Sequence, residues 1–349
     1  MLAENAILAA FILLPVLLLW GLIKFFRSGK AGKESGGTLR VIAGNLLILV
    51  FLFSLLLLGG EIYYRFIYDT TDSFGLTKTT QAWFKRHFKA NNAGARDSQQ
   101  SYQNQLPEGK KRRVTFIGDS FTAGHGVRDV EDRFANRVRA ARPGWDVHVF
   151  GFNGWDTGHE LAMLRDLDPR YQLDHVVLVY CLNDISDAIP EWQAILTRIY
   201  ENNKPKNVFS EHSYLLNMLH YRVMAASDPE VANYYDFTLD GYLGPIWRQQ
   251  EARLRELVGR VRARGGTVSV MTFPFLHTIG EDDSFEPVHR KLNALWASLG
   301  VPHLDLRPLY LEHADENLVV SRYDAHPNEY AHGLAADALL PFLDRAMGE

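Results

Sequence analysis

A serine in the first half of the chain and a histidine near its end have the settings that nucleophilic catalysis needs. Ser120 stands in the block Gly118-Asp119-Ser120-Phe121-Thr122-Ala123-Gly124, directly after an apolar run, where a strand-to-helix turn would expose its hydroxyl. His326 comes two residues after Asp324, so an imidazole that could take the serine proton has a carboxylate close by to fix its tautomer. These residues predict acyl transfer through a covalent acyl-serine.

Taken singly, each motif has a plainer interpretation. Glycine, aspartate and serine are common turn residues, and a lone Asp-x-His is more often a surface turn that ends in a helix cap, here Asn328. An oxyanion also needs donors besides the N–H of Ser120, and Gly154 and Asn183 could supply a backbone N–H and a side-chain amide. Alone, Gly154 would be a turn glycine and Asn183 a strand-end cap.

The elements that would position these residues favour one arrangement. From Val114 onward, apolar runs alternate with amphipathic stretches, which predicts βαβ units that build a parallel sheet. Five strands are predicted, over residues 113–118, 147–152, 175–180, 267–273 and 303–306. Helical patterns cover residues 132–141, 159–167, 246–263, 286–299 and 328–347. Because the carboxyl ends of parallel strands meet at one edge of a sheet, Ser120, Gly154 and Asn183 should lie close together, and the loop after the last strand can bring His326 there.

The chain is expected to divide into three parts. Residues 1–67 hold two apolar runs, residues 68–112 form a polar linker or packing segment, and residues 113–349 form the α/β domain. The longest interruption of that domain, residues 187–245, contains helical patterns at 192–200 and 213–226.

Two long apolar runs near the N-terminus predict transmembrane helices, at about residues 6–26 and 41–60. The second run holds fourteen Leu, Ile, Val or Phe residues, which together contribute about −4 to −8 kcal/mol to insertion. A cleaved signal peptide is the alternative for the first run, but such peptides begin with a basic residue, and the only charge before Lys24 is Glu4. Pro15 is tolerated within a membrane span.

The charges between the two runs predict the topology. Five cations stand against the single acid Glu34, and they are Lys24, Arg27, Lys30, Lys33 and Arg40. By the positive-inside rule this short loop is cytoplasmic, and everything after Glu61 is then extracytoplasmic.

Four polar blocks, in this order, make the sequence resemble the SGNH, or GDSL, hydrolase family over about residues 113–343. The blocks are Gly118 to Gly124 with Ser120, Gly151-Phe152-Asn153-Gly154-Trp155-Asp156-Thr157, Cys181-Leu182-Asn183-Asp184 and Asp324-Ala325-His326-Pro327-Asn328. The resemblance implies a flavodoxin-like three-layer α/β/α sandwich with a parallel five-stranded sheet. It implies Ser120 as nucleophile, His326 as base and Asp324 as its orienting acid, with oxyanion donors from Ser120, Gly154 and Asn183.

Two positions depart from the family pattern. Cys181 stands where glycine usually opens the third block, so either the backbone manages without glycine or the thiol points into the core. The last block is often Asp-x-x-His, whereas only Ala325 separates Asp324 from His326 and Tyr323 stands at the usual aspartate position. The one-residue spacing also occurs in relatives that move acyl groups on extracytoplasmic glycans.

The composition of the chain limits which partners, disulfides and metal sites can be expected. A net charge of −4 argues against a nucleic-acid partner, because a polyanion binder needs a concentrated basic face. The single cysteine, Cys181, excludes an intramolecular disulfide and a set of cysteine metal ligands. No metal or other cofactor is expected, since the spacing of His313 and His332 resembles no metal site. His125, five residues after Ser120, could line the pocket, but a solvent-facing loop residue is favoured.

The expected function is that of a membrane-anchored serine esterase or acyl-transfer enzyme that acts on ester-linked acyl groups of extracytoplasmic glycans, with water or a hydroxyl as acceptor. A lipid or lysophospholipid ester is the alternative substrate, which the membrane anchor alone favours. A second alternative is a catalytically silent binding or scaffold domain, against which the intact Ser120, Asn183 and His326 count. Protein partners are not indicated.

Overall fold

The computed structural model describes residues 2–28, 37–167, 170–281 and 283–348, which form two compact units. The first unit contains residues up to Asp69, Leu76–Ala82 and Tyr200–Asp228. The second contains Thr70–Gly75, Trp83–Ile199 and Pro229–Glu349. The predicted division of the chain at residues 67 and 112 stays a prediction. The second unit includes much of the predicted linker, residues 68–112, because it contains Thr70–Gly75 and the chain from Trp83 onward.

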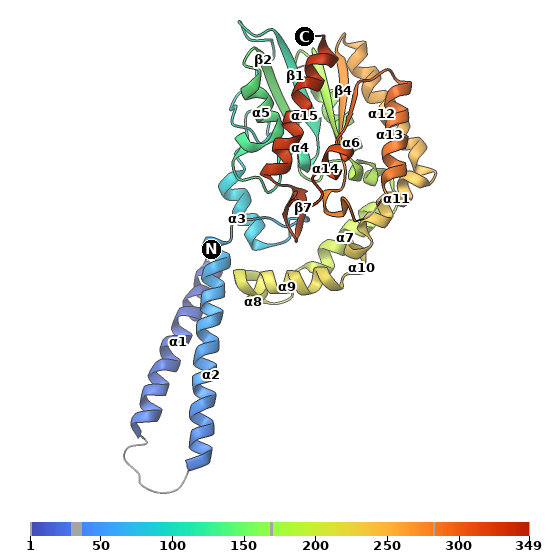
Figure 1. The fold of residues 1–349 in the computed structure, drawn as a ribbon. Coiled ribbons are helices and arrows are strands. Elements are labelled where there is room, and N and C mark those ends of the chain that lie inside the picture. Colours follow the sequence, from blue (N-terminus) through green and yellow to red (C-terminus); the bar gives the residue numbers. More distant parts are fainter. Residues whose placement is uncertain (1, 29–36, 168–169, 282, 349) are drawn as a thin grey trace. The chain divides into compact units, whose positions relative to one another are not determined.

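A five-stranded parallel sheet forms the centre of the second unit (Figure 1). Its strands lie in the order β2-β1-β3-β4-β5 and are β1 (Arg112–Gly118), β2 (Trp145–Gly151), β3 (His175–Cys181), β4 (Thr267–Phe273) and β5 (His303–Asp305). The central strand β3 is a continuous apolar run from Val176 to Cys181 and is buried throughout, because helices cover both faces of the sheet. The predicted parallel sheet is confirmed.

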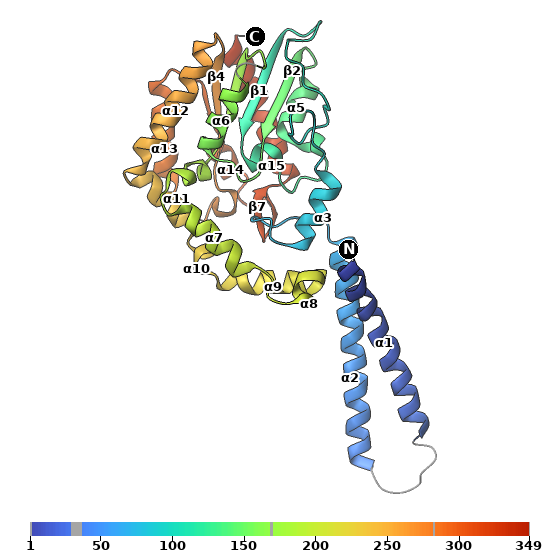
Figure 2. The same cartoon turned by 180° about the vertical axis from the view of Figure 1, so that it is seen from behind.

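Helices lie on both faces of this sheet, as the three-layer fold requires. α5 (Phe134–Ala141) and α15 (Glu329–Met347) pack together in front of the strands in Figure 1, and α6 (Thr157–Leu167) and α12 (Ile246–Ala263) pack together on the other side, in front in Figure 2. α13 (Glu286–Ser298) contacts β5. The remaining helices of this unit are short: α4 (Ser120–Ala123), α10 (Pro229–Ala232), α11 (Tyr234–Leu243) and α14 (Arg307–Leu311).

A small antiparallel pair of strands precedes α15. β6 (Val319–Ser321) pairs with β7 (Asp324–Pro327). The sequence predicts a loop here instead. These strands are not recognisable from the sequence because three or four residues are too few to show a hydrophobic period. Asn328 then caps α15 by accepting a hydrogen bond from the N–H of Ala331 at 2.9 Å.

The first unit contains two long apolar helices, α1 (Leu2–Ser28) and α2 (Gly37–Ile62), which pack against each other. Both are long and apolar enough to cross a membrane, and most of their large apolar side chains are exposed. α2 continues into a π-helical turn at Tyr63–Ile67. The same unit contains α8 (Val208–His212) and α9 (Tyr214–Ser227), while α3 (Lys78–His87) and α7 (Trp192–Asn203) pass from one unit into the other. Residues 29–36 of the predicted cytoplasmic loop lie outside the described residues, and the remainder of that loop belongs to the ends of α1 and α2.

Candidate active site

Ser120 begins α4 at the carboxyl end of β1. Asp119 caps the turn by accepting a hydrogen bond from the N–H of Phe121 at 2.8 Å. The turn can lie this close to the sheet only because glycine ends both neighbouring strands. A Cβ on Gly118 would lie 2.6 Å from the carbonyl oxygen of Val179, and a Cβ on Gly151 would lie 2.4 Å from the backbone nitrogen of Ala123. The two glycines therefore set where the serine stands.

Ser120, His326 and Asp324 are joined by hydrogen bonds in one line. Nε2 of His326 is 2.8 Å from Oγ of Ser120, and its Nδ1 is 2.5 Å from Oδ1 of Asp324. Because Nδ1 faces the carboxylate, the proton of the neutral ring lies on Nδ1, and Nε2 accepts the hydrogen of the serine hydroxyl. All three side chains are buried. The structure thus brings together the three residues that the sequence predicts as a catalytic set.

The strand β7 explains how the short Asp-x-His spacing works. Successive side chains of a strand point to opposite sides, so residues two apart lie on the same side. Asp324 and His326 are both buried, whereas Ala325 between them is partly exposed. A one-residue spacing on an extended strand therefore presents the carboxylate and the imidazole together, and Tyr323 is not needed as the acid.

Burial and neighbouring charges set the protonation of this line. Burial lowers the pKa of His326 and a nearby His125 lowers it further, against the opposite effect of Asp324. Burial would raise the pKa of Asp324, but the charges and hydrogen bonds of His326 and His125 outweigh it and hold that pKa far below its usual range. At neutral pH the imidazole is therefore an unprotonated base and the carboxylate is charged, as proton abstraction from Ser120 requires.

His125 is a second histidine beside the same carboxylate. Its ring stacks on that of His326 at 4.2 Å between centroids, and its Nε2 lies 3.4 Å from Oδ2 of Asp324 and 3.2 Å from the carbonyl oxygen of Asp72. Burial lowers its pKa, but the carboxylates of Asp324 and Asp72 and their hydrogen bonds outweigh this and raise it. The expectation of a solvent-facing residue is wrong, since His125 is only 5% exposed.

The segment Thr70–Gly75 holds the Asp324 strand in place. The hydroxyl of Thr71 donates a hydrogen bond to Oδ2 of Asp324, and the N–H of Ala325 donates to Oγ of Ser73 at 2.9 Å. The sequence analysis missed Thr71 and Ser73, because they belong to a polar stretch with no strand or motif around it. No pattern in the sequence singles them out.

Asn183 lies close to the serine turn, at the start of the 3-10 helix that follows β3. Its Nδ2 is 3.5 Å from Oδ2 of Asp119, and Oγ of Ser120 is 3.4 Å from the same oxygen. Burial raises the pKa of Asp119 to about 6, despite the hydrogen bonds it accepts. Cys181 is fully buried, so the thiol does point into the core.

Gly154 is in the exposed turn between β2 and α6, with a φ of 74° that favours glycine. Among the described residues no hydrogen bond joins it to Ser120, Asn183 or His326, and its N–H is not bonded within the protein. The structure thus brings Asn183 next to the serine turn, whereas Gly154 lies three residues after Gly151, the end of the neighbouring strand β2.

The atoms that could hold a metal at this site are already engaged with one another. Ligand atoms of His125, Asp324 and His326 lie within 4.8 Å of one another. Both ring nitrogens of His326 have hydrogen-bond partners, Ser120 and Asp324, which is the arrangement of a proton-transfer group. The arrangement described is suited to acid-base chemistry.

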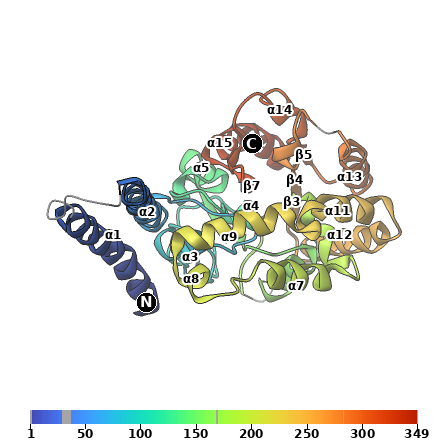
Figure 3. The same cartoon turned by 90° about the horizontal axis from the view of Figure 1, so that it is seen from below.

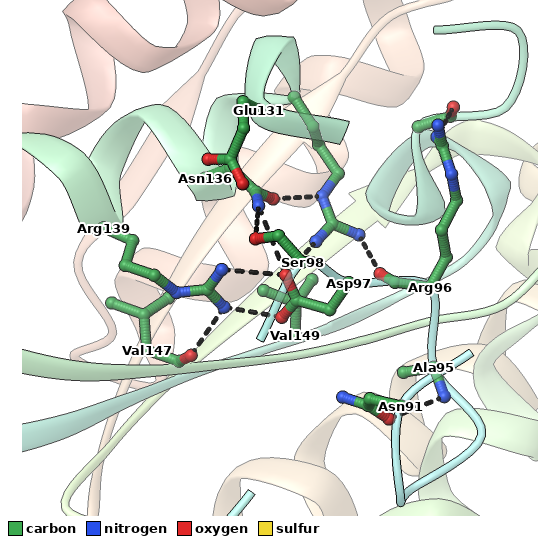
Figure 4. A network of polar contacts seen from close by, with 12 residues as sticks. Asn91, Ala95, Arg96, Asp97, Ser98, Glu131, Asn136, Arg139, Val147 and Val149 are labelled. Carbon is green, nitrogen blue, oxygen red and sulfur yellow. Dashed lines mark hydrogen bonds and ion pairs between the residues drawn. The ribbon is translucent and has the colours of Figure 1, made fainter. Parts of the chain in front are cut away.

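A buried network of charges supports the loop that follows Ser120. Arg96 donates to the carbonyl oxygens of Gly124 and Val127, each at 2.7 Å. Figure 4 shows the neighbouring carboxylate of Asp97, which Arg139 binds through two nitrogens at 2.8 and 2.5 Å. Burial would raise the pKa of Asp97, but Arg139 and Arg133 lower it to about 2. Arg96 and Asp97 belong to the segment predicted to be a linker or packing segment, residues 68–112, and in the structure this segment supports the loop after Ser120.

Solved structures with similarity to this chain include three hydrolases. One is a member of the lipolytic G-D-S-L family from Veillonella parvula, with 14% identity over 67% of this chain and 99% of its own, at a TM-score of 0.43. An acetylxylan esterase from Geobacillus stearothermophilus has 15% identity over 68% of this chain and 96% of its own, at 0.43. A psychrotrophic esterase from Pseudoalteromonas sp. has 13% identity over 68% and 99%, also at 0.43.

The family assignment rests on a sequence match rather than on these distant structures. No curated protein matches the sequence. A family model described as "GDSL-like Lipase/Acylhydrolase family" matches residues 116–334, which is more than half of the chain and includes Ser120, Asp324 and His326. The chain therefore belongs to the GDSL-like lipase/acylhydrolase family.

Proposed function

We propose that this ester-cleaving hydrolase is a membrane-anchored serine enzyme that forms an acyl-enzyme on Ser120. The observation that carries the proposal is the unbroken line from Oγ of Ser120 through His326 to Asp324. A nucleophile, a base within hydrogen-bond reach and a third group that orients the base are the parts that covalent acyl transfer needs. The low pKa of His326 supports its role as base at neutral pH.

The proposed reaction has two steps that use the same residues. Oγ of Ser120 attacks the ester carbonyl while His326 takes its proton, and Asp324 stabilises the resulting imidazolium. The tetrahedral oxyanion receives hydrogen bonds from the N–H groups of Ser120 and Gly154 and from the amide of Asn183. The ester C–O bond then breaks and the leaving alcohol takes the proton from His326. Water or another hydroxyl next attacks the acyl-serine with His326 again as base.

The proposed substrate is a short acyl ester on an extracytoplasmic glycan. It is supported by the Asp-x-His spacing at Asp324 and by the basic loop between the two apolar helices, which would place residues after Glu61 outside the cytoplasm. A lipid or lysophospholipid ester is the second candidate, because α1 and α2 are apolar enough to hold the enzyme at a bilayer. A silent scaffold is the third, and the intact hydrogen-bonded line counts against it.

Covalent labelling of the full-length protein with a fluorophosphonate tests the proposal. Ser120→Ala should remove labelling and ester turnover with little change in melting temperature, because loss of one hydroxyl at a turn leaves no core cavity. Ser298→Ala, on α13 outside the site, should label like the wild type. Turnover by Ser120→Ala at the wild-type rate would exclude the mechanism. Separately, a panel of glycan and lipid esters with varied acyl length would rank the substrates of the wild-type protein.

A further inference from the structure

The helices α8 and α9 expose an apolar surface that a water-facing element would not have. α9 has fourteen residues, and Arg222 is its only formally charged side chain. A helix at a protein surface normally carries charged residues on the side away from the core. The exposed surface of α9 is therefore suited to an environment other than water.

One face of α9 is buried in its unit and the other is apolar and exposed. Leu215, Met218 and Tyr221 are buried. On the opposite side Leu219 is 44% exposed and Val223, one turn later, is 66% exposed. α8 adds to the exposed set, which is Val208 at 52%, Phe209 at 55%, Leu219 and Val223. We call these four residues the apolar face.

Glu61 ties α9 to the end of α2, the second candidate membrane span. The carboxylate of Glu61 accepts hydrogen bonds from Oγ of Ser213 at 2.7 Å and from the N–H of Leu215 at 3.0 Å. A Cβ on Gly60 would lie 3.0 Å from the side chain of Leu215, so the two helices are in close contact. The apolar face therefore belongs to an element that begins where the span ends.

The direction of α9 and its surroundings fit the surface of a bilayer. Within this unit α9 runs across α2 rather than along it, and Figure 3 shows α9 at nearly full length while α2 is seen almost end-on. Phe66 and Ile67, just after α2, are 61% and 64% exposed. Arg222 stacks over the ring of Tyr64 at 5.4 Å, which is a combination typical of the interface between lipid and water.

We infer that α8 and α9 lie in the surface of the lipid bilayer, with the apolar face turned into the acyl-chain region. An amphipathic helix with a low content of charge on its apolar side binds a bilayer in this way, parallel to the membrane plane. The occupant is the bilayer because the apolar face and the exposed apolar side chains of α2, a candidate membrane span, belong to one compact unit. The inference rests on the membrane anchoring in the proposed function, and it adds a second, interfacial contact to the two spans.

Depth-dependent fluorescence quenching of the full chain in phosphatidylcholine vesicles tests the inference. Cys181 is the only cysteine, and its burial and raised pKa keep it from labelling in the folded protein. Leu219→Cys and Val223→Cys would each carry a nitrobenzoxadiazole probe. Leu52→Cys on the exposed surface of α2 is the control for a span, and Ala252→Cys on the exposed side of α12 is the control for water.

Phosphatidylcholines with a nitroxide near the headgroup should quench the probes at Leu219 and Val223 more than lipids with a nitroxide deep in the acyl chain. The probe at Leu52 should be quenched most by the deep nitroxide, and the probe at Ala252 only by aqueous iodide. If Leu219 and Val223 behave like Ala252, or are shielded from both lipid and iodide, the bilayer does not cover the apolar face. If the Leu52 probe also escapes lipid quenching, the membrane anchoring itself is wrong.

Discussion

Two histidines share one carboxylate at the candidate site, and the difference between their pKa shifts assigns their roles. His326 has a hydrogen bond to Ser120 and a lowered pKa, whereas the polar contacts of His125 are to Asp324 and Asp72 and its pKa is raised. A protonated His125 disfavours a second cation on His326, whose ring centroid is 4.2 Å from its own. We expect His125 to act in the proposed reaction through the protonation of His326, as a positioning residue.

Replacement of His125 should move the pH profile of the enzyme. In His125→Phe the neighbouring positive charge is lost, so the pKa of His326 rises and the acid limb of kcat/KM shifts to higher pH. The plateau should fall by less than about tenfold, because the line from Ser120 to Asp324 stays in place. His313→Phe is the control, because the polar contact of His313 is to Tyr330 and not to the line from Ser120 to Asp324. An acid limb unchanged from the wild type would show that His125 does not set the pKa of the base.

Asn183 is expected to stabilise the oxyanion rather than the end of a strand. A donor that acts in the transition state predicts that Asn183→Ala lowers kcat by about 10² to 10³, or roughly 2.7–4 kcal/mol, with little change in KM. A cap predicts instead a lower melting temperature, at about 0.5–2 kcal/mol, and an unchanged kcat per folded molecule. Both quantities can be measured on one preparation. Normal kcat with reduced stability would reject the catalytic role.

The site residues that stand in recognisable motifs can be predicted from the sequence, and the others cannot. Ser120, Asn183 and His326 follow strands or stand before a capped helix, so pattern and position predict that they meet. Thr71 and His125 reach Asp324 only through tertiary packing, and neither occupies a recognisable place in a pattern. Contacts between segments far apart in the sequence leave no local signal to read.

At the scale of elements, the length of an apolar run decides whether a strand can be predicted from the sequence. β4 begins and ends where the sequence predicts, and the other four strands of the sheet agree within two residues, because long buried runs of Val, Ile and Leu leave little choice. β6 and β7 are missed because strands this short need a partner to define them. For α9 the pattern at residues 213–226 predicts a helix but not its surroundings, and α8 is not predicted.

The close approach of α4 to β2 predicts the effect of a single methyl group. In Gly151→Ala the new Cβ would stand 2.4 Å from the nitrogen of Ala123, against backbone that cannot move freely. We expect about 1–3 kcal/mol of lost stability and a lower kcat, because the turn that carries Ser120 is displaced. Gly259→Ala in α12 meets nothing within 4 Å and should stabilise by up to about 1 kcal/mol. Thermal melts and ester turnover measure both effects, and wild-type behaviour of Gly151→Ala would contradict the proposed close fit.

At the scale of the whole molecule, the site is built from segments that precede the sheet as well as from the sheet itself. Thr71 and Ser73 contact the strand of Asp324 and His326, and Arg96 supports the loop after Ser120. A fragment that starts at Arg113 would lack all three of these contacts. Function therefore has to be measured on the full chain, in detergent or in vesicles.

The orientation of the full chain in the membrane decides which substrates the site can meet. Five cations between the apolar runs predict that their loop is cytoplasmic and that the C-terminus is outside. Alkaline phosphatase, which is active only outside the cytoplasm, should work when fused after Glu349 and fail when inserted at Gly32, and a fluorescent protein that matures only inside should show the opposite pattern. Removal of the five charges should weaken this preference. A phosphatase that fails at Glu349 while the fluorescent protein works there would place the site in the cytoplasm, which would exclude extracytoplasmic glycans as substrates and leave the serine chemistry untouched.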